Sequence, residues 1–136
     1  MRDAITIYTD ADRVGDVVTI TIAVRLPEST HIEPHEPADP FLIPTVLSTD
    51  DLVEPRWTYP RPVVKELGFE GMTLTVLEGT VEFTVTGRLR DEVTMVEGTL
   101  SFQPCIGGAC LPPRTIAWEA PVNGSTGYSV LGALAA

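Results

Sequence analysis

The chain has 136 residues, with 9 basic against 19 acidic side chains and a formal net charge of −10. A chain of this length fits one domain, which buries roughly two-thirds of the surface that its unfolded form exposes, so it can fold without disulfides. The negative charge has the wrong sign for binding nucleic-acid phosphates or anionic lipid headgroups. No apolar run approaches the length of a membrane span, and the first residues contain no hydrophobic signal-peptide core. We therefore expect a soluble protein that does not bind nucleic acid, and we also expect it to be a monomer.

Prolines and glycines interrupt the sequence so regularly that no helical period persists, which favours an all-β protein. Residues 4–8 form a short first predicted strand. Residues 16–26 form the clearest one, because apolar side chains from Val18 to Leu26 alternate with polar or small ones. The next segment, 27–40, is rich in prolines and acids, so we expect an ordered loop or a meandering edge and not a central strand.

The rest of the chain contains further short strands with turn signals between them. The predicted strands are 41–47, which Pro44 interrupts, and then 72–77, 80–89, 94–102 and 115–122. We expect 80–89 and 94–102 to form a hairpin around residues 90–92. About seven short strands of this kind predict an immunoglobulin-like, two-sheet antiparallel β-sandwich. We assign this domain to residues 1–122 and expect 123–136 to be a C-terminal tail or linker.

The two cysteines of the chain, Cys105 and Cys110, flank a short loop that contains Gly107 and Gly108. The glycines allow positive φ, so the two Cα atoms can approach the roughly 5.5 Å that a disulfide prefers. So short a ring would stabilise the fold by roughly 2 kcal/mol, near the low end for disulfides. Structural disulfides of immunoglobulin-like domains instead join the two sheets. The spacing favours a reversible redox pair over a passive clip or a metal site, without excluding either.

A metal site lacks ligands. A structural zinc ion needs four, and the other obvious candidates, His31 and His35, lie some seventy residues before the cysteines. We expect both histidines to be solvated or hydrogen-bonded loop residues, and we expect neither a bound metal nor a cofactor.

The segment Phe102–Val122, FQPCIGGACLPPRTIAWEAPV, resembles the cysteine block and last strand of a known family. That family is the N-terminal periplasmic domain of DsbD-type thiol–disulfide interchange proteins, also described as a disulfide-bond corrector domain. Other stretches resemble segments of that family more weakly, among them Thr30-His31-Ile32, Ile43-Pro44-Thr45 and the run from Tyr59 to Gly71. The resemblance covers most of residues 4–122.

The resemblance implies an immunoglobulin-like sandwich whose Cys105 and Cys110 take electrons from a membrane-embedded cysteine segment. The cysteines would pass them to periplasmic thioredoxin-like proteins, for example in cytochrome c biogenesis. By position, Cys110 is expected to form the mixed disulfide first, Phe69 to be the cap aromatic, and Glu66 or Glu70 to be its acidic neighbour. The compartment implied is periplasmic or extracytoplasmic, and the chain would be a domain excised from a membrane protein. The alternative is an immunoglobulin-like binding module with a passive disulfide.

The charge around the cysteines leads to an expectation about their reactivity. Arg114 is the only obvious cation nearby in the sequence, and the domain as a whole is acidic. We therefore expect no strongly depressed thiol pKa. A thiolate titration midpoint below about 6, against a free-thiol reference near 8.5, would contradict this.

Overall fold

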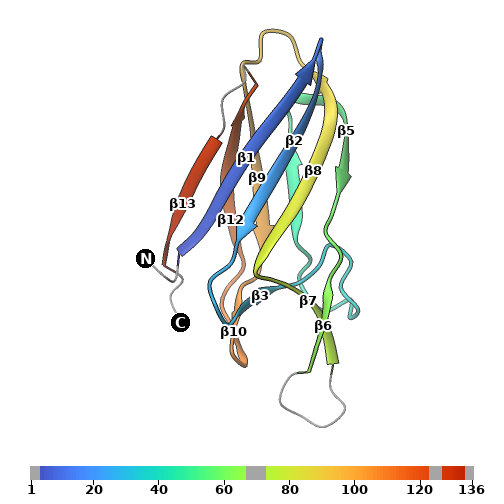
Figure 1. The fold of residues 1–136 in the computed structure, drawn as a ribbon. Coiled ribbons are helices and arrows are strands. Elements are labelled where there is room, and N and C mark those ends of the chain that lie inside the picture. The colour runs from blue at the N-terminus through green and yellow to red at the C-terminus, as the bar shows by residue number, and fades with distance from the viewer. Residues whose placement is uncertain (1–3, 67–72, 123–126, 134–136) are drawn as a thin grey trace.

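The structure is a computed structural model that describes residues 4–66, 73–122 and 127–133. It is an immunoglobulin-like sandwich of antiparallel strands, as the sequence predicts (Figure 1). No helix in these ranges is long and apolar enough to cross a membrane.

The larger face of the sandwich is a sheet of five strands in the order β13-β1-β2-β8-β5. Their bounds are β1 Ala4–Val14, β2 Val17–Arg25, β5 Leu52–Thr58, β8 Thr80–Leu89 and β13 Gly127–Ala133. The predicted strand 16–26 is confirmed as β2, and its alternation places Val18, Ile20, Ile22 and Val24 in the core. The predicted strand 4–8 continues further than expected, to Val14.

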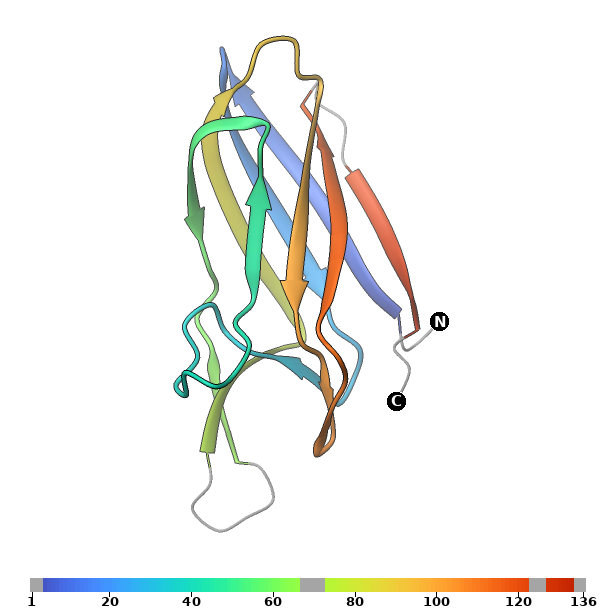
Figure 2. The ribbon, with the colours of Figure 1, turned by 180° about the vertical axis from the view of Figure 1, so that it is seen from behind.

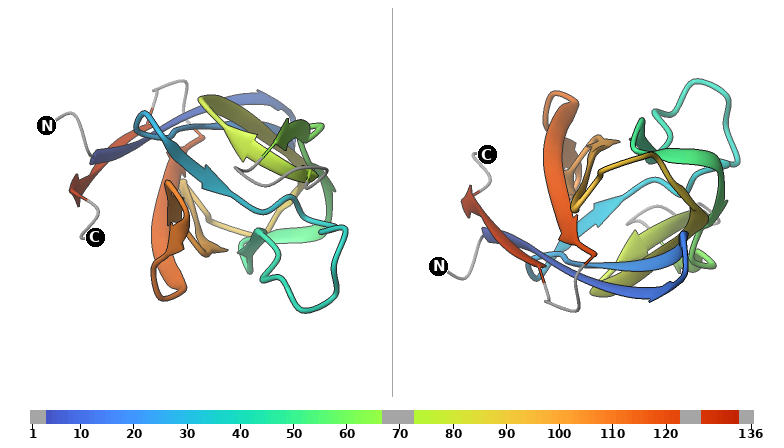
Figure 3. Two further views of the ribbon diagram at one scale, coloured as in Figure 1. Left: turned by 90° about the horizontal axis from the view of Figure 1, so that it is seen from below. Right: turned by 90° about the horizontal axis from the view of Figure 1, so that it is seen from above.

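The opposite face is a sheet of three strands in the order β12-β9-β4 (Figure 2). Their bounds are β4 Val46–Thr49, β9 Met95–Phe102 and β12 Arg114–Pro121. Views along the sandwich show β9 and β12 on one side and β1 and β2 on the other (Figure 3). The two layers enclose a core in which Trp118 and Phe83 are the largest fully buried side chains.

A third sheet lies at one end of the sandwich, in the order β11-β10-β3-β7-β6 (Figures 1 and 2). Its strands are β3 Thr30–Ile32, β6 Val63–Glu66, β7 Thr73–Glu78, β10 Cys105–Ile106 and β11 Ala109–Cys110. This small sheet contains both cysteines, so it positions the candidate site.

The predicted hairpin of residues 80–89 and 94–102 is wrong. Both strands exist, as β8 and β9, but β8 pairs with β2 and β5 whereas β9 pairs with β12 and β4. Since both edges of β8 are already occupied, the connection after Leu89 crosses from one sheet to the other (Figure 2).

The expectation that 27–40 contains no central strand is also wrong. Thr30–Ile32 pairs on one side with β10 and on the other with β7, so β3 is the middle strand of the small sheet. The prolines do not prevent this, because Pro27 and Pro34 flank the three paired residues and leave their backbone N–H groups available.

The predicted strand 41–47 begins only at Val46. Pro44 lacks an N–H group, and the N–H of Thr45 bonds to the carbonyl of Pro34, 3.3 Å away, and not to a neighbouring strand.

Two strands of the large sheet lie where none was predicted. β5 contains Pro55, which a sheet accepts here because the register with β8 shifts between Val53 and Arg56 and Glu54 takes a φ of 50°. β13 pairs with β1 at the other edge, within the segment 123–136 for which a tail or linker is expected.

Candidate functional site

The two cysteines form a disulfide on a minimal hairpin. Cys105 on β10 lies directly opposite Cys110 on β11, and the Cα atoms are 3.9 Å apart. The loop between the strands is Gly107 and Gly108, of which Gly107 has a φ of 61°. A positive φ at the first loop position is what a type II′ turn requires, and glycine adopts it without strain. The pairing expected from the spacing is therefore present.

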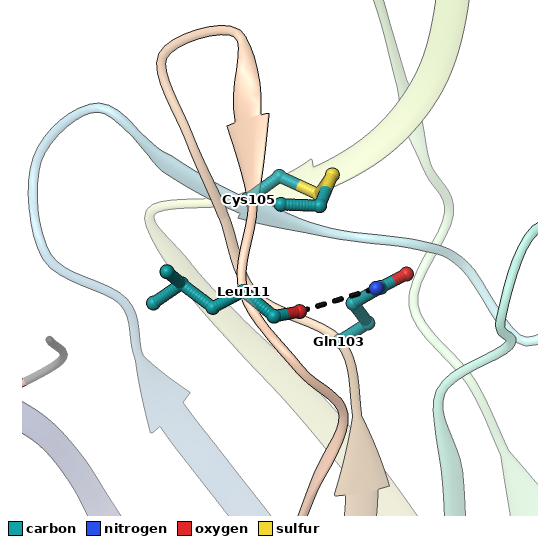
Figure 4. Close-up of a disulfide and its surroundings, with 4 residues drawn as sticks. Gln103, Cys105 and Leu111 are labelled. Carbon is teal, nitrogen blue, oxygen red and sulfur yellow. Dashed lines mark hydrogen bonds between the residues drawn. A yellow bond between two sulfur atoms is a disulfide. The ribbon is translucent and has the colours of Figure 1, made fainter. Parts of the chain in front are cut away.

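Hydrogen bonds hold this hairpin in place independently of the disulfide. The N–H of Leu111 donates to the carbonyl of Pro104 at 2.8 Å, and the N–H of Gly107 donates to the carbonyl of Ser29 at 3.3 Å. The side-chain amide of Gln103 donates to the carbonyl of Leu111 at 3.1 Å (Figure 4). These bonds do not involve sulfur, so they can persist when the disulfide opens.

The two cysteines differ in exposure. Cys105 is 4% exposed, whereas Cys110 belongs to the exposed residues at the end of the hairpin. A thiolate from another protein can therefore approach the Cys110 side of the bond more easily than the Cys105 side, because exchange depends on access to the attacked sulfur.

The register of the small sheet places two ionisable residues in line with the disulfide. Cys105 lies opposite His31 on β3, and His31 lies opposite Glu78 on β7. Residues directly opposite each other in antiparallel strands share one face of the sheet. The row Cys110, Cys105, His31, Glu78 therefore crosses four strands. Lys65 on β6 adds a cation, because its Nζ lies 2.5 Å from Oε2 of Glu78.

The row borders a cleft of about 590 Å³. The residues that line this cleft are Ser29, Thr30, His31, Glu33, Leu42, Lys65, Glu66, Leu74, Glu78, Gln103, Cys105, Gly107, Gly108 and Cys110. The cleft thus brings together residues from five separate segments of the chain beside one disulfide.

Two of the ionisable groups in the cleft have shifted pKa values. Burial lowers the pKa of His31, the positive charge of Lys65 lowers it further, and the negative charge of Glu78 opposes the shift. Burial raises the pKa of Glu33, which is 3% exposed. Its Oε1 is buried and has no hydrogen-bond partner among the described residues. Both shifts favour the neutral form of the side chain. His31 and Glu33 are therefore charged over a narrower pH range than exposed side chains of the same types.

The other predicted site residues are placed as follows. Glu66, the last residue of β6, is exposed and lines the cleft, while Phe69 and Glu70 lie outside the described residues. The cation expected near the cysteines was Arg114, but the cleft contains Lys65 instead. No spacing in the sequence links Lys65, Glu78 and Glu33 to the cysteines, because only the pairing of distant strands brings them together.

His31 and His35 do not act as a pair. His31 is 7% exposed and lies on β3 in the cleft, so the expectation of a solvated or hydrogen-bonded loop residue is wrong for it. His35 instead stacks on Tyr59 with ring centroids 3.8 Å apart, and its Nδ1 lies 2.9 Å from the carbonyl oxygen of Thr45. Among the described residues, no group of three or more His, Cys, Asp or Glu side chains is arranged to hold a metal ion.

Comparisons with known proteins agree with this architecture. No family model matches the sequence, and no curated protein matches it. Among solved structures, the N-terminal periplasmic domain of ScsB from Proteus mirabilis matches with a TM-score of 0.69 at 15% identity, over 89% of this chain and 48% of that one. This chain shares the fold of about half of that ScsB domain. The fold expected from the DsbD resemblance is thereby confirmed, although the chain spans only about half the length of the ScsB structure.

The N-terminal domain of Neisseria meningitidis DsbD, solved in the reduced form, also matches, with a TM-score of 0.48 at 18% identity. That match covers 90% of this chain and 89% of the DsbD domain.

Proposed function

We propose that this chain is a thiol–disulfide exchange domain in which the Cys105–Cys110 bond opens and closes reversibly. In this proposal it accepts electrons from a membrane-embedded cysteine segment and delivers them to extracytoplasmic thioredoxin-like proteins. No cofactor is needed, because sulfur itself carries the electrons.

One observation supports this function above the others: the disulfide joins adjacent strands at the end of the sandwich, with one exposed and one buried cysteine. A bond in this place adds little to the fold, since the hairpin is already hydrogen-bonded, yet it offers one sulfur to a partner. It differs from the long-range bridge between sheets that stabilises immunoglobulin domains.

The different exposure of the two cysteines determines the order of the exchange. A partner thiolate attacks Sγ of Cys110, the disulfide breaks, and the electron pair of the broken bond goes to Sγ of Cys105. The second thiol of the partner then attacks the mixed disulfide and releases Cys110 as a thiolate. The partner is oxidised by two electrons, the domain is reduced by two, and the two thiol protons of the partner balance the two new thiols.

Further parts of the proposal concern residues around the bond. Phe69 is proposed as a cap that shields the disulfide until a partner displaces it, with Glu66 or Glu70 as its acidic neighbour. The position of Glu66 on the cleft is compatible with that role.

Equilibration with glutathione tests the redox function. A relay should equilibrate at a potential within reach of thioredoxin-like proteins, whereas structural disulfides usually lie below about −300 mV. A bond that stays closed across the whole accessible range would favour the alternative, a binding module with a passive disulfide.

Trapping tests which cysteine exchanges. In Cys105→Ser the exposed Cys110 keeps its thiol but the domain cannot resolve a mixed disulfide, so a complex with a thioredoxin-like protein should accumulate. The matched variant Cys110→Ser leaves only the buried Cys105 and should trap little. Failure of both variants to trap any such protein would contradict the relay.

A further inference from the structure

His31 lies next to the buried sulfur of the site. It is the central residue of β3 and is directly opposite Cys105 on β10. Side chains at directly opposed positions of antiparallel strands have Cβ atoms about 4.5–5.5 Å apart. Since His31 is also buried, its ring is enclosed on the same face as the Cys105 sulfur and has little contact with water.

The charged and titratable groups around His31 come from every neighbouring strand. Cys105 lies on one side on β10, and Glu78 lies on the other side on β7. Lys65 on β6 acts on His31 electrostatically and pairs with Glu78, and Glu33 and Glu66 line the same cleft. Burial and the charge of Lys65 hold the pKa of His31 below its usual value of 6.5, so the ring is neutral at pH 7. A neutral imidazole in this position can accept a proton.

The proposed exchange has one step that needs such an acceptor. When the reduced domain has formed a mixed disulfide through Cys110, Cys105 must become a thiolate before it can attack and resolve the complex. Burial makes a thiolate costly, and water reaches this side of the hairpin poorly.

We propose that His31 is the base that takes the thiol proton of Cys105 during this attack and returns it in the reverse direction. The inference rests on the exchange function proposed above. The sulfur–sulfur bond between Cys110 and the target breaks, and the Cys105–Cys110 bond forms. The target sulfur leaves as a thiolate with the electron pair, takes a proton from water, and is thereby reduced. His31 releases the proton of Cys105 to the solvent through the cleft.

The experiment uses oxidised glutathione as the target. The reduced domain is mixed with it, samples are quenched with acid, and mass spectrometry follows the decay of the mixed disulfide. His31→Gln should slow this decay at pH 7 at least about tenfold, because a positioned base contributes about 10² or more. His35→Gln is the matched control and should not change the rate, since His35 lies outside the cleft.

The pH dependence separates a proton acceptor from a merely structural residue. Above the thiol pKa of Cys105, measured by thiolate absorbance in Cys110→Ser, Cys105 ionises without a base, so the deficit of His31→Gln should disappear. A second variant leaves His31 in place. Lys65→Met removes an exposed cation that lowers the pKa of His31, so the rise of the rate with pH should move to higher pH.

Several outcomes would overturn the inference. These are a His31→Gln rate within twofold of the unmodified protein at pH 7, a deficit that persists above the measured thiol pKa of Cys105, or a rate profile unmoved by Lys65→Met. If the unmodified protein forms no mixed disulfide at all, the proposed function fails together with this inference. If it forms and resolves one independently of His31, only the inference fails.

Discussion

Reducing the Cys105–Cys110 bond should leave the domain folded, with a modest and calculable loss of stability. The bond closes a ring of about six residues, for which the loop-closure estimate is roughly 2 kcal/mol. In a domain of this size that loss corresponds to a fall in Tm of roughly 6–8 °C. The backbone bonds of Gly107 and Leu111 remain after reduction, so the hairpin should keep its position.

The assay is urea unfolding of the same protein with and without a dithiol reductant, followed by tryptophan fluorescence. Reduction is preferable to substituting both cysteines by alanine, because Cys105 is buried and its loss would add a packing cost. A reduced protein that is unfolded in water, or a loss above about 5 kcal/mol, would refute the reasoning. The bond would then be a structural staple, and reversible opening would not be its role.

Two further predictions concern single residues. The raised pKa of Glu33 means that its contribution to stability is complete below the unfolded value near 4.5 and is lost as the pH rises through the folded pKa. Glu33→Gln should therefore be more stable than the unmodified protein at pH 7, by about 1 kcal/mol, and similar to it at pH 4; urea midpoints giving the same difference at both pH values would contradict this. Gly98→Ala should cost about 1–3 kcal/mol in urea unfolding, because its new methyl group would overlap the ring of Trp118 and the carbonyl oxygen of Ser48. Gly108→Ala, whose new methyl group meets no atom of the described residues within 4 Å, should be nearly neutral, and equal losses in the two variants would exclude the steric explanation.

The local pattern of the sequence correctly predicts the buried side chains of strands that have one buried face. The alternation in β2, β8, β9 and β12 predicted which side chains enter the core, and burial confirms it for Ile20, Phe83, Leu100 and Trp118. The pattern was a poor guide to pairing. Residues 80–89 and 94–102 would present the same alternation in a hairpin and in two facing sheets, because each strand contributes one apolar face in both cases.

The sequence pattern also fails to predict the shortest strands. β3 has three residues and β10 and β11 have two each, which is too few for a period to be visible. β5 was missed because Pro55 argues against a strand unless a bulge accommodates it.

The local residue pattern is sufficient to predict that the protein is all-β and that Cys105 and Cys110 can form a disulfide, since the glycine loop between them lets the chain turn back on itself. The tertiary structure is needed to show that Cys105 is buried while Cys110 is exposed, and that His31, Glu33, Lys65 and Glu78 line a cleft beside the bond. These residues are far apart along the chain and meet because β3, β7 and β10 pair at one end of the sandwich. Backbone hydrogen bonds between distant segments set that pairing, and no spacing within the sequence encodes it.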